Sequence, residues 1–382
     1  MEDKMSRRDT ILTTLEHKEP KIIPHEVETY DIVALKKFLP KFDDSWREET
    51  LKRLEFLDNS IVDMTPSHIH ESAWIKEAHN LLRVQGSPSS CGAGFLRTSQ
   101  IEENEEYVVI EFETKGRWKI YKEPFRRDYI DYPIKIDEDL EKLESIDIDN
   151  PERYKGVQES AKFFKEKGYF TSAEIYGFFT GVWYRYYKFE DYLMDFIRRK
   201  TFIRRLVDLH GKMNLNAAKN YLERGVDSIY FCDDLGDNRG LLISPEAYKK
   251  VIYPWHKRIA DLCHQYGAFC HMHSHGNINK IMAFLVKAGI DILNPLDPQD
   301  GMNLRDLKDR YGKKMTFLAT TTRSIENMSK QEIEELVKER INEGKPGGGF
   351  ILHLGGITPN VDKEKFDFYL DVSKSLRSNF QN

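Results

Sequence analysis

Short apolar runs alternate with amphipathic segments along most of the C-terminal half of this chain, and two similar runs precede that half. Strands that alternate with helices in this way pair in parallel. The strand candidates are residues 21–27, 60–63, 168–174, 226–232, 268–273, 290–294, 315–319 and 350–353. Eight parallel strands close a barrel, so the sequence predicts an α/β protein, a (β/α)8 TIM barrel.

Helical patterns separate these strand candidates. They cover residues 193–224, 244–266, 279–288, 304–311 and 330–343. The second of them opens with Ser244, a good N-cap, followed by proline and glutamate, which favour the first turn. An open doubly wound sheet is the alternative architecture. It would favour a glycine-rich GxGxxG turn after its first strand, and the sequence has none.

Residues 80–135 interrupt the alternation of strands and helices. Within them, residues 108–121 alternate with period two around Lys115 and Gly116, a pattern typical of a β-hairpin. We interpret residues 80–135 as an insertion with a β-hairpin, carried by a single domain that spans residues 1–382.

Composition excludes several classes of function. The net charge is -5 and no basic block occurs, so no nucleic-acid partner is expected. No apolar stretch approaches the roughly 20 residues of a membrane helix, and the N-terminus lacks the apolar core of a secretory signal. The four cysteines are scattered without a CxxC pair, which indicates a reducing, cytoplasmic location.

Three histidines, His271, His273 and His275, end the strand candidate at residues 268–273, just before Gly276. Side chains at alternate positions of a strand share one face, so the three imidazoles are expected to point the same way. Imidazole is the commonest protein ligand for zinc. His273 and His275 are the predicted metal ligands. The alternative is a pair of scaffold histidines held by carboxylates.

Other polar residues gather where strands end, the position of active sites in TIM barrels. Asp234 and His353 are the candidate catalytic residues, as acid–base groups or further ligands. The candidates for substrate binding are Glu174, Tyr176, Trp183, Tyr184, Asp233 and His271. Simpler interpretations remain open: Asp233 and Asp234 could cap the following helix, and His353 could be a packed core histidine.

Three segments carry a resemblance to the uroporphyrinogen decarboxylase (URO-D) superfamily: residues 233–254, residues 347–352 and residues 6–20. The first contains the DDLG sequence and the helix start at Ser244. The resemblance covers nearly the whole chain, less clearly residues 40–160, and implies a single (β/α)8 barrel. It also implies a homodimer, as in many members of the superfamily.

The superfamily has two known branches. True uroporphyrinogen decarboxylases hold a polyanionic tetrapyrrole with an arginine-rich loop, RQAGRY, after the first strand. The matching residues 24–31 contain no arginine and three acids, which would repel those carboxylates. The other branch moves methyl groups between a corrinoid protein and an acceptor. Its HxCG metal motif matches His273-Ser274-His275-Gly276, with imidazole in place of the thiolate.

This resemblance is nearest to the methyltransferase branch and to its uncharacterised DDLG members. It implies a methyltransferase that transfers a methyl group between a corrinoid (cobalamin) on a partner protein and a small-molecule acceptor, with zinc as the metal. Two alternatives stay open. One is a cofactor-free decarboxylase-type lyase acting on a small carboxylated substrate. The other is a non-catalytic barrel that docks a corrinoid protein.

Overall fold

A computed structural model describes residues 5–27, 46–63, 96–122, 126–320, 325–355 and 361–378 of this chain. Its main sheet has eight strands in the order β1-β14-β13-β12-β11-β8-β7-β2, and every neighbouring pair is parallel. The strands are β1 (His25–Val27), β2 (Ile61–Asp63), β7 (Phe170–Ile175), β8 (Ser228–Cys232), β11 (Phe269–His273), β12 (Ile292–Asn294), β13 (Thr316–Thr320) and β14 (Phe350–Leu354). The predicted (β/α)8 barrel is confirmed, and the open doubly wound sheet is not observed.

The barrel closes between β1 and β2 through side chains and a backbone bond from the Ser60 N–H to the His25 carbonyl at 3.0 Å, rather than through a regular strand ladder. The Asn59 amide accepts from the backbone N–H of Val27 at 2.8 Å and donates to its carbonyl at 3.1 Å. The Glu26 carboxylate accepts from the N–H of Ile61 at 3.2 Å. These bonds satisfy edge groups that a β1–β2 ladder would have paired, and they leave a nearly closed barrel.

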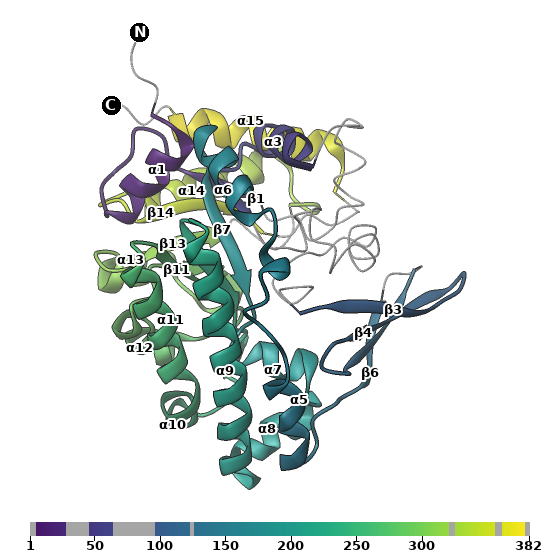
Figure 1. The fold of residues 1–382 in the computed structure, drawn as a ribbon. Helices are drawn as coiled ribbons and strands as arrows, with labels where there is room; N and C mark the ends of the chain where they lie inside the picture. The colour runs from purple at the N-terminus through teal and green to yellow at the C-terminus, as the bar shows by residue number, and fades with distance from the viewer. Residues whose placement is uncertain are drawn as a thin grey trace.

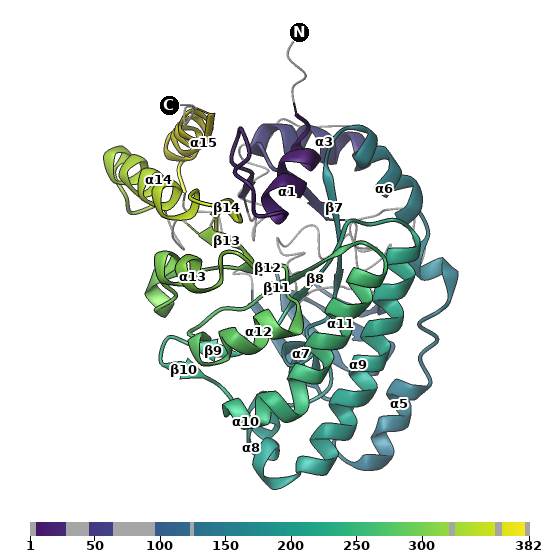
Figure 2. The ribbon, with the colours of Figure 1, turned by 90° about the vertical axis from the view of Figure 1, so that its left-hand side faces the viewer.

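Helices surround the strands (Figures 1 and 2). They are α1 (Arg7–Leu15), α3 (Trp46–Leu57), α5 (Glu141–Glu144), α6 (Val157–Glu166), α7 (Thr180–Arg185), α8 (Phe189–Arg198), α9 (Lys200–Glu223), α10 (Pro245–Ala247), α11 (Tyr253–Gln265), α12 (Met282–Ala288), α13 (Leu304–Tyr311), α14 (Lys330–Gly344) and α15 (Lys363–Ser378). None of the helices in the described ranges is both long enough and apolar enough to cross a bilayer.

Two predicted helices are interrupted. Residues 193–224 form α8 and α9, because Arg199 between them leaves the helical conformation and donates to the Lys135 carbonyl at 2.9 Å. The helix after Ser244 begins at the predicted cap, but residues 248–252 form a π-helical turn before α11. Pro254 lacks an N–H and crowds the preceding turn, which favours this wider turn.

The barrel interior changes from apolar to polar along the strands. Five inward residues form its floor, where α1 plugs the barrel with Ile11 and Leu15; the five are Ile61, Phe170, Ile292, Leu318 and Ile351. Positions two and four residues further along share the inward face. These positions include Glu174, Asn294 and His353. Polar groups therefore line the carboxyl end of the barrel.

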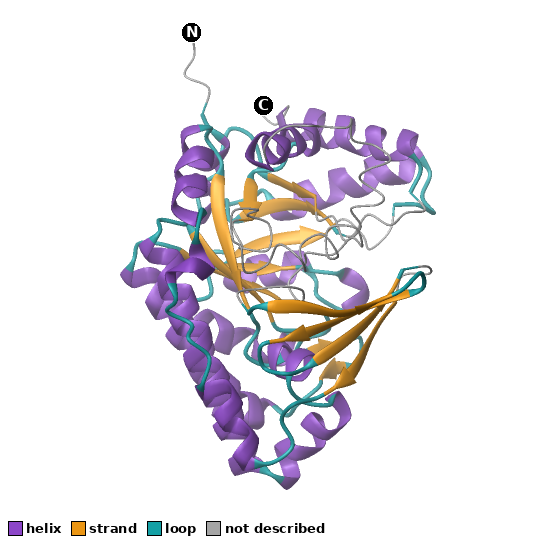
Figure 3. Ribbon diagram, turned by 45° about the vertical axis from the view of Figure 1, so that its right-hand side comes forward, coloured by secondary structure: helices purple, strands orange, loops and turns teal. Residues whose placement is uncertain are grey.

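The inserted region is a four-stranded antiparallel sheet, which projects beside the barrel in Figure 3. Its strands are β3 (Thr98–Glu103), β4 (Tyr107–Phe112), β5 (Arg117–Tyr121) and β6 (Arg126–Asp131). The predicted hairpin is confirmed as the β4–β5 pair, which turns at Lys115 with a φ of 73°. Trp118 ties this sheet to α7 through a 3.2 Å bond to the Tyr184 carbonyl. Residues 80–95 of the predicted insertion lie outside the described residues.

Candidate metal centre

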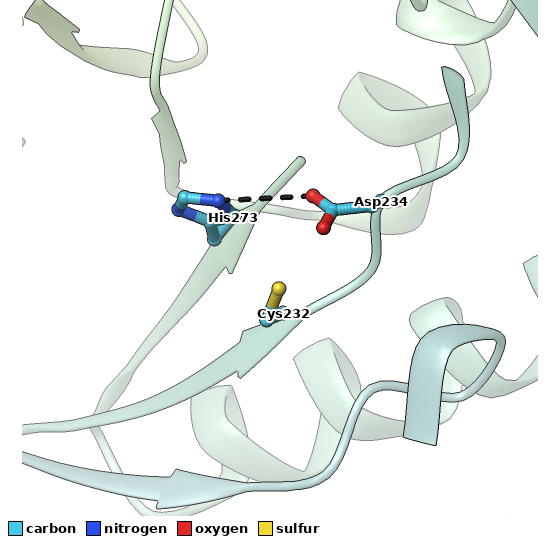
Figure 4. A group of neighbouring side chains, drawn as sticks. All are labelled: Cys232, Asp234 and His273. Carbon is cyan, nitrogen blue, oxygen red and sulfur yellow. Dashed lines mark ion pairs between the residues drawn. The ribbon is translucent and has the colours of Figure 1, made fainter. Parts of the chain in front are cut away.

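Three side chains with different donor atoms meet at the carboxyl ends of β8 and β11. They are the Cys232 thiol, the Asp234 carboxylate and the His273 imidazole, and their ligand atoms all lie within 4.8 Å of one another. His273 Nε2 lies 3.7 Å from Asp234 Oδ1. Figure 4 shows the sulfur of Cys232 pointing toward the space between the other two groups.

Strand register brings these groups together. Cys232 and His273 are paired positions at the ends of neighbouring parallel strands, so their inward side chains are adjacent. Asp234 lies two residues beyond Cys232. Its backbone N–H donates to Thr180 Oγ1 at 2.8 Å, and its Oδ1 accepts from the N–H of His275 at 2.8 Å. Bonds from α7 and from the histidine loop therefore fix the position of Asp234.

The histidine loop is also packed tightly against the segment that follows Asp234. Gly276 has a φ of 87°, and a Cβ there would lie 2.1 Å from the carbonyl carbon of Gly236. The Gly276 N–H donates to Asp300 Oδ2 at 3.0 Å. Glycine is required here for both the left-handed conformation and the close backbone contact.

Only two of the three predicted histidines share a strand face. His271 and His273 are both in β11, but the strand ends at His273 and His275 lies in the following loop. The expectation that all three imidazoles project from one strand face is therefore corrected. The His275 ring still packs edge-on against His273, with centroids 4.7 Å apart. His275 is next to the three-donor group without belonging to it.

His271 and His273 are joined by the amide of Asn294 at the end of β12. Asn294 Oδ1 lies 2.8 Å from His271 Nε2, and Asn294 Nδ2 lies 3.0 Å from His273 Nδ1. Tyr230 of β8 packs edge-on against His271, with ring centroids 4.8 Å apart. Asn294 and Tyr230 were not among the predicted site residues, although each lies on the polar inward face of its strand.

Asp233 has a different environment from Asp234. It is fully buried, and its carboxylate accepts from the N–H groups of Phe178, Phe179 and Thr180 at 2.7 to 3.0 Å. His256 Nε2 lies 2.7 Å from the same carboxylate. Asp233 therefore anchors the loop before α7 to α11, while substrate binding by it stays a prediction.

Glu174 and His353 both lie on the inner wall of the barrel. Glu174 is buried and pairs in register with Tyr230. His353 is buried and pairs with Thr320 and Glu26. Strands β12 and β13 lie between β14 and β11 in the sheet. His353 and His273 therefore lie on different sides of the barrel interior.

The predicted aromatic residues lie around α7. Tyr176 is fully buried, with the Arg185 guanidinium 3.4 Å from its ring centre and the Leu96 N–H donating to its hydroxyl at 3.2 Å. This burial raises the pKa of Tyr176. Trp183 and Tyr184 are partly exposed and stack with centroids 3.9 Å apart. Tyr176 is therefore enclosed in the core, whereas Trp183 and Tyr184 form an accessible aromatic pair.

The donor set fits zinc. Thiolate, imidazole and carboxylate are its three common protein ligands, and a tetrahedral ion needs ligand atoms about 3.3 to 3.8 Å apart. The 3.7 Å between His273 Nε2 and Asp234 Oδ1 lies at the upper end of that range. All three donor atoms lie within 4.8 Å of one another, so binding of an ion would draw them closer together. Cys232 would supply the sulfur ligand that the sequence motif lacks at residue 275. No feature of the sequence alone marks Cys232, because its proximity to His273 depends on the register of β8 against β11.

Comparisons with known proteins agree with this fold. The sequence profile of the uroporphyrinogen decarboxylase (URO-D) family matches residues 121–376. No curated protein sequence matches the chain. Among solved structures, a methyltransferase from Methanosarcina mazei is 13% identical with a TM-score of 0.65, and the match covers 98% of this chain and 99% of that chain. A B12-independent methionine synthase from Shewanella sp. W3-18-1 is 11% identical with a TM-score of 0.43, over 86% of this chain and 85% of that chain.

At these identities, the likeness to the solved structures concerns the fold alone. The family match is stronger because it rests on the sequence and spans more than half of the chain. It also includes β8 and β11, the strands that carry Cys232 and His273. The resemblance noted in the sequence is thereby confirmed: this chain belongs to the uroporphyrinogen decarboxylase family.

Proposed function

We propose that this chain is a metal-dependent methyltransferase that moves a methyl group from a corrinoid, carried by a partner protein, to a small acceptor molecule. The observation that carries the proposal is the group of Cys232, Asp234 and His273, whose donor atoms lie within 4.8 Å of one another at the carboxyl end of the barrel. Membership of the family and the full-length likeness to a methyltransferase fold support it.

Zinc is the metal proposed, because one thiolate, one imidazole and one carboxylate suit its borderline softness. Three protein ligands are typical of catalytic zinc sites, where the fourth position is left to a small molecule. When bound, the ion supplies a Lewis acid that lowers the pKa of an acceptor's thiol or hydroxyl group.

The chain's own residues then have distinct roles in the proposed reaction. The acceptor's heteroatom forms a bond to the methyl carbon, while the carbon–cobalt bond breaks and its electron pair stays with the corrinoid. The acceptor's proton leaves first, and His353 on the inner wall is the proposed base. Glu174 and His271 are the proposed polar contacts to the acceptor.

The accessible aromatic pair supplies a further proposed contact. Trp183 and Tyr184 stack on each other and remain partly exposed in α7, which follows β7 on the carboxyl side of the barrel. Tryptophan and tyrosine offer large apolar ring surfaces with a polar edge, which suits contact with a ligand at a partly solvated site. Substrate binding by this pair fits a corrinoid that approaches the barrel mouth from the side of α7.

Metal analysis is the first test. Protein purified without chelators or a nickel column is expected to hold about one equivalent of zinc per chain. The variants C232S, D234N and H273A should each lose it. C270S is the matched control, since Cys270 is a buried cysteine on β11 that packs into the outer core. A content of less than about a tenth of an equivalent of any transition metal in the wild-type protein would contradict the proposed metal-dependent mechanism.

Turnover is the second test. Methylcobalamin serves as the methyl donor with small thiols and phenols as acceptors, and loss of the carbon–cobalt bond is followed by absorbance. The zinc-loaded protein should demethylate methylcobalamin, and treatment with EDTA should stop the reaction. Activity on a carboxylated substrate that survives EDTA would instead support the lyase. Corrinoid-protein binding that H273A leaves intact, without turnover, would support the docking barrel.

A further inference from the structure

One buried amide connects two histidines of the site. Asn294 Oδ1 lies 2.8 Å from His271 Nε2, and Asn294 Nδ2 lies 3.0 Å from His273 Nδ1. All three side chains are buried, and the strand register places Asn294 beside His273. The amide is therefore held between two imidazole nitrogens, and each of its ends has a ring as partner.

An amide side chain has one accepting end and one donating end, so it imposes complementary proton positions on the two rings. The ring that faces the oxygen must present an N–H, and the ring that faces the NH2 group must present a bare nitrogen. With the amide oriented in this way, hydrogen bonding requires a proton at Nε2 of His271 and a bare Nδ1 on His273. A neutral His273 then carries its proton at Nε2, the nitrogen that faces Asp234.

Binding of a metal through His273 Nε2 requires the opposite arrangement. The ligating nitrogen carries no proton, so a neutral His273 has its proton at Nδ1. That N–H would meet the NH2 group of Asn294 unless the amide turns its oxygen toward His273. The NH2 group then faces His271 Nε2, which must become the bare nitrogen, with the proton of His271 at Nδ1. Each ring keeps one proton throughout.

We propose that Asn294 is a positioning residue that couples the tautomer of His271 to metal occupancy at His273. This inference rests on the proposed metal-dependent function for its metal-bound half, whereas its metal-free half rests on the contacts of Asn294 with the two rings. His271 packs against Tyr230 within the barrel. Metal binding therefore changes which nitrogen of this interior histidine donates a hydrogen bond.

Nitrogen-15 NMR of protein labelled at histidine tests the coupling directly, because the pattern of ring correlations shows which nitrogen carries the proton. Signals are assigned from the H271N and H273N variants. In wild-type protein without metal, His271 should be protonated at Nε2 and His273 should have a bare Nδ1. Addition of zinc should move the protons of both rings to Nδ1. A His271 tautomer that stays the same while His273 coordinates zinc would overturn the proposal.

Variants of Asn294 separate coupling from simple support. In N294D both carboxylate oxygens accept, so His271 and His273 should both donate to it, and zinc should leave the His271 tautomer unchanged. N294A should weaken zinc binding by roughly tenfold to a hundredfold, the range typical of an outer-shell partner. N214A is the matched control, because Asn214 is also a buried amide beside a histidine, His210, but lies on α9. It should leave zinc affinity unchanged.

The outcomes distinguish this inference from the proposed function. If zinc fails to bind while the metal-free rings show the complementary protons, the metal-dependent function is wrong and the amide arrangement stands. If zinc binds through His273 but N294D still shows the change of the His271 tautomer, the coupling does not run through Asn294. Equal zinc affinity in N294A and wild type would also contradict a positioning role.

Discussion

Cys232 and His273 occupy paired positions at the ends of two neighbouring parallel strands, and their side chains project to the same side of the sheet. This relationship places a cysteine sulfur one strand away from the histidine motif. Asp234 follows Cys232 in the same alternation and completes the group. The donors therefore come from two strand ends that are fixed relative to each other by backbone hydrogen bonds.

Replacing Cys232 by serine should remove the softest ligand of the proposed site. We expect zinc affinity in C232S to fall by more than the roughly tenfold to hundredfold loss typical of an outer-shell partner. Cobalt substitution provides the readout, because a thiolate bound to cobalt(II) gives a charge-transfer band in the near ultraviolet. The band should be present in wild type and absent in C232S.

C270S is the control for this experiment. Burial raises the pKa of the Cys270 thiol well above its ordinary value, and Cys263 is its hydrogen-bonding neighbour. Cys270 packs into the hydrophobic core and does not belong to the group of Cys232, Asp234 and His273. The cobalt band should therefore persist in C270S. Persistence of the band in C232S would show that another group supplies the thiolate.

Substitution by asparagine should affect metal binding at Asp234 and the stability of the fold at Asp233. D234N is expected to lose zinc binding with little change in the free energy of unfolding, since Asp234 is partly exposed. D233N should destabilise the fold by about 3 kcal/mol or more, because three backbone donors and His256 face a buried carboxylate that the amide only partly replaces. Urea denaturation together with metal titration checks both variants.

A reversal of this pattern would contradict the assignment of roles. Loss of zinc in a folded D233N protein would place Asp233 in the metal site. A strongly destabilised D234N protein would show that Asp234 mainly supports the histidine loop, to which it already bonds through the N–H of His275.

The barrel was predictable because its signals are local. Each of the eight predicted strands is present within a few residues, since apolar runs bounded by polar or glycine residues leave few other options. The break at Arg199 was not predictable, because neither proline nor glycine marks it. The Arg199 side chain donates to the carbonyl of Lys135, a residue far away in the sequence.

The group of Cys232, Asp234 and His273 is predicted only in part, and metal binding by His273 and His275 stays a prediction. His273 was found from its motif, and Asp234 was found as a residue at a strand end. Cys232 is not predicted, because a lone cysteine does not indicate a metal site until the register of β8 against β11 is known. His275 was placed on the strand face because the alternation of the sequence continues past His273, whereas the strand does not. Both the position of Cys232 beside His273 and the end of the strand at His273 depend on how segments far apart in the sequence pair in the sheet. That register cannot be read from a single sequence.

Gly276 offers a test of how the histidine loop positions Asp234. In G276A the new methyl group would lie 2.1 Å from the carbonyl carbon of Gly236, so the segment after Asp234 must move. We expect weaker zinc binding in addition to a backbone strain of about 1 to 3 kcal/mol. G267A is the matched control, because Gly267 has a φ of 67° but open space around it. A G276A protein that binds zinc as G267A does would show that the close contact has no role in the site.

Acid should destabilise the fold through His210. Burial lowers the pKa of His210 from 6.5 to about 3, and its Nε2 lies 2.8 Å from the Gly177 carbonyl, just before the loop that Asp233 anchors. The unfolded chain takes up this proton below about pH 6.5 while the folded chain does not, so the free energy of unfolding falls by about 1.4 kcal/mol per pH unit as the pH decreases toward 3. His25, whose pKa burial also lowers, acts in the same direction.

Urea denaturation between about pH 7 and pH 4.5 measures this dependence as a slope. H210Q should be less stable at neutral pH but should show a shallower loss toward acid, by about one proton. His264 provides a control of opposite sign, since its bond to Asp291 raises its pKa. That bond contributes stability below the unfolded pKa of His264, and this stability is lost as the pH rises through the higher folded value. H264Q should therefore change the pH dependence only near and above about pH 6.5, whereas H210Q changes it below that pH. Equal slopes in H210Q and wild type would show that His210 is not held neutral in the folded protein.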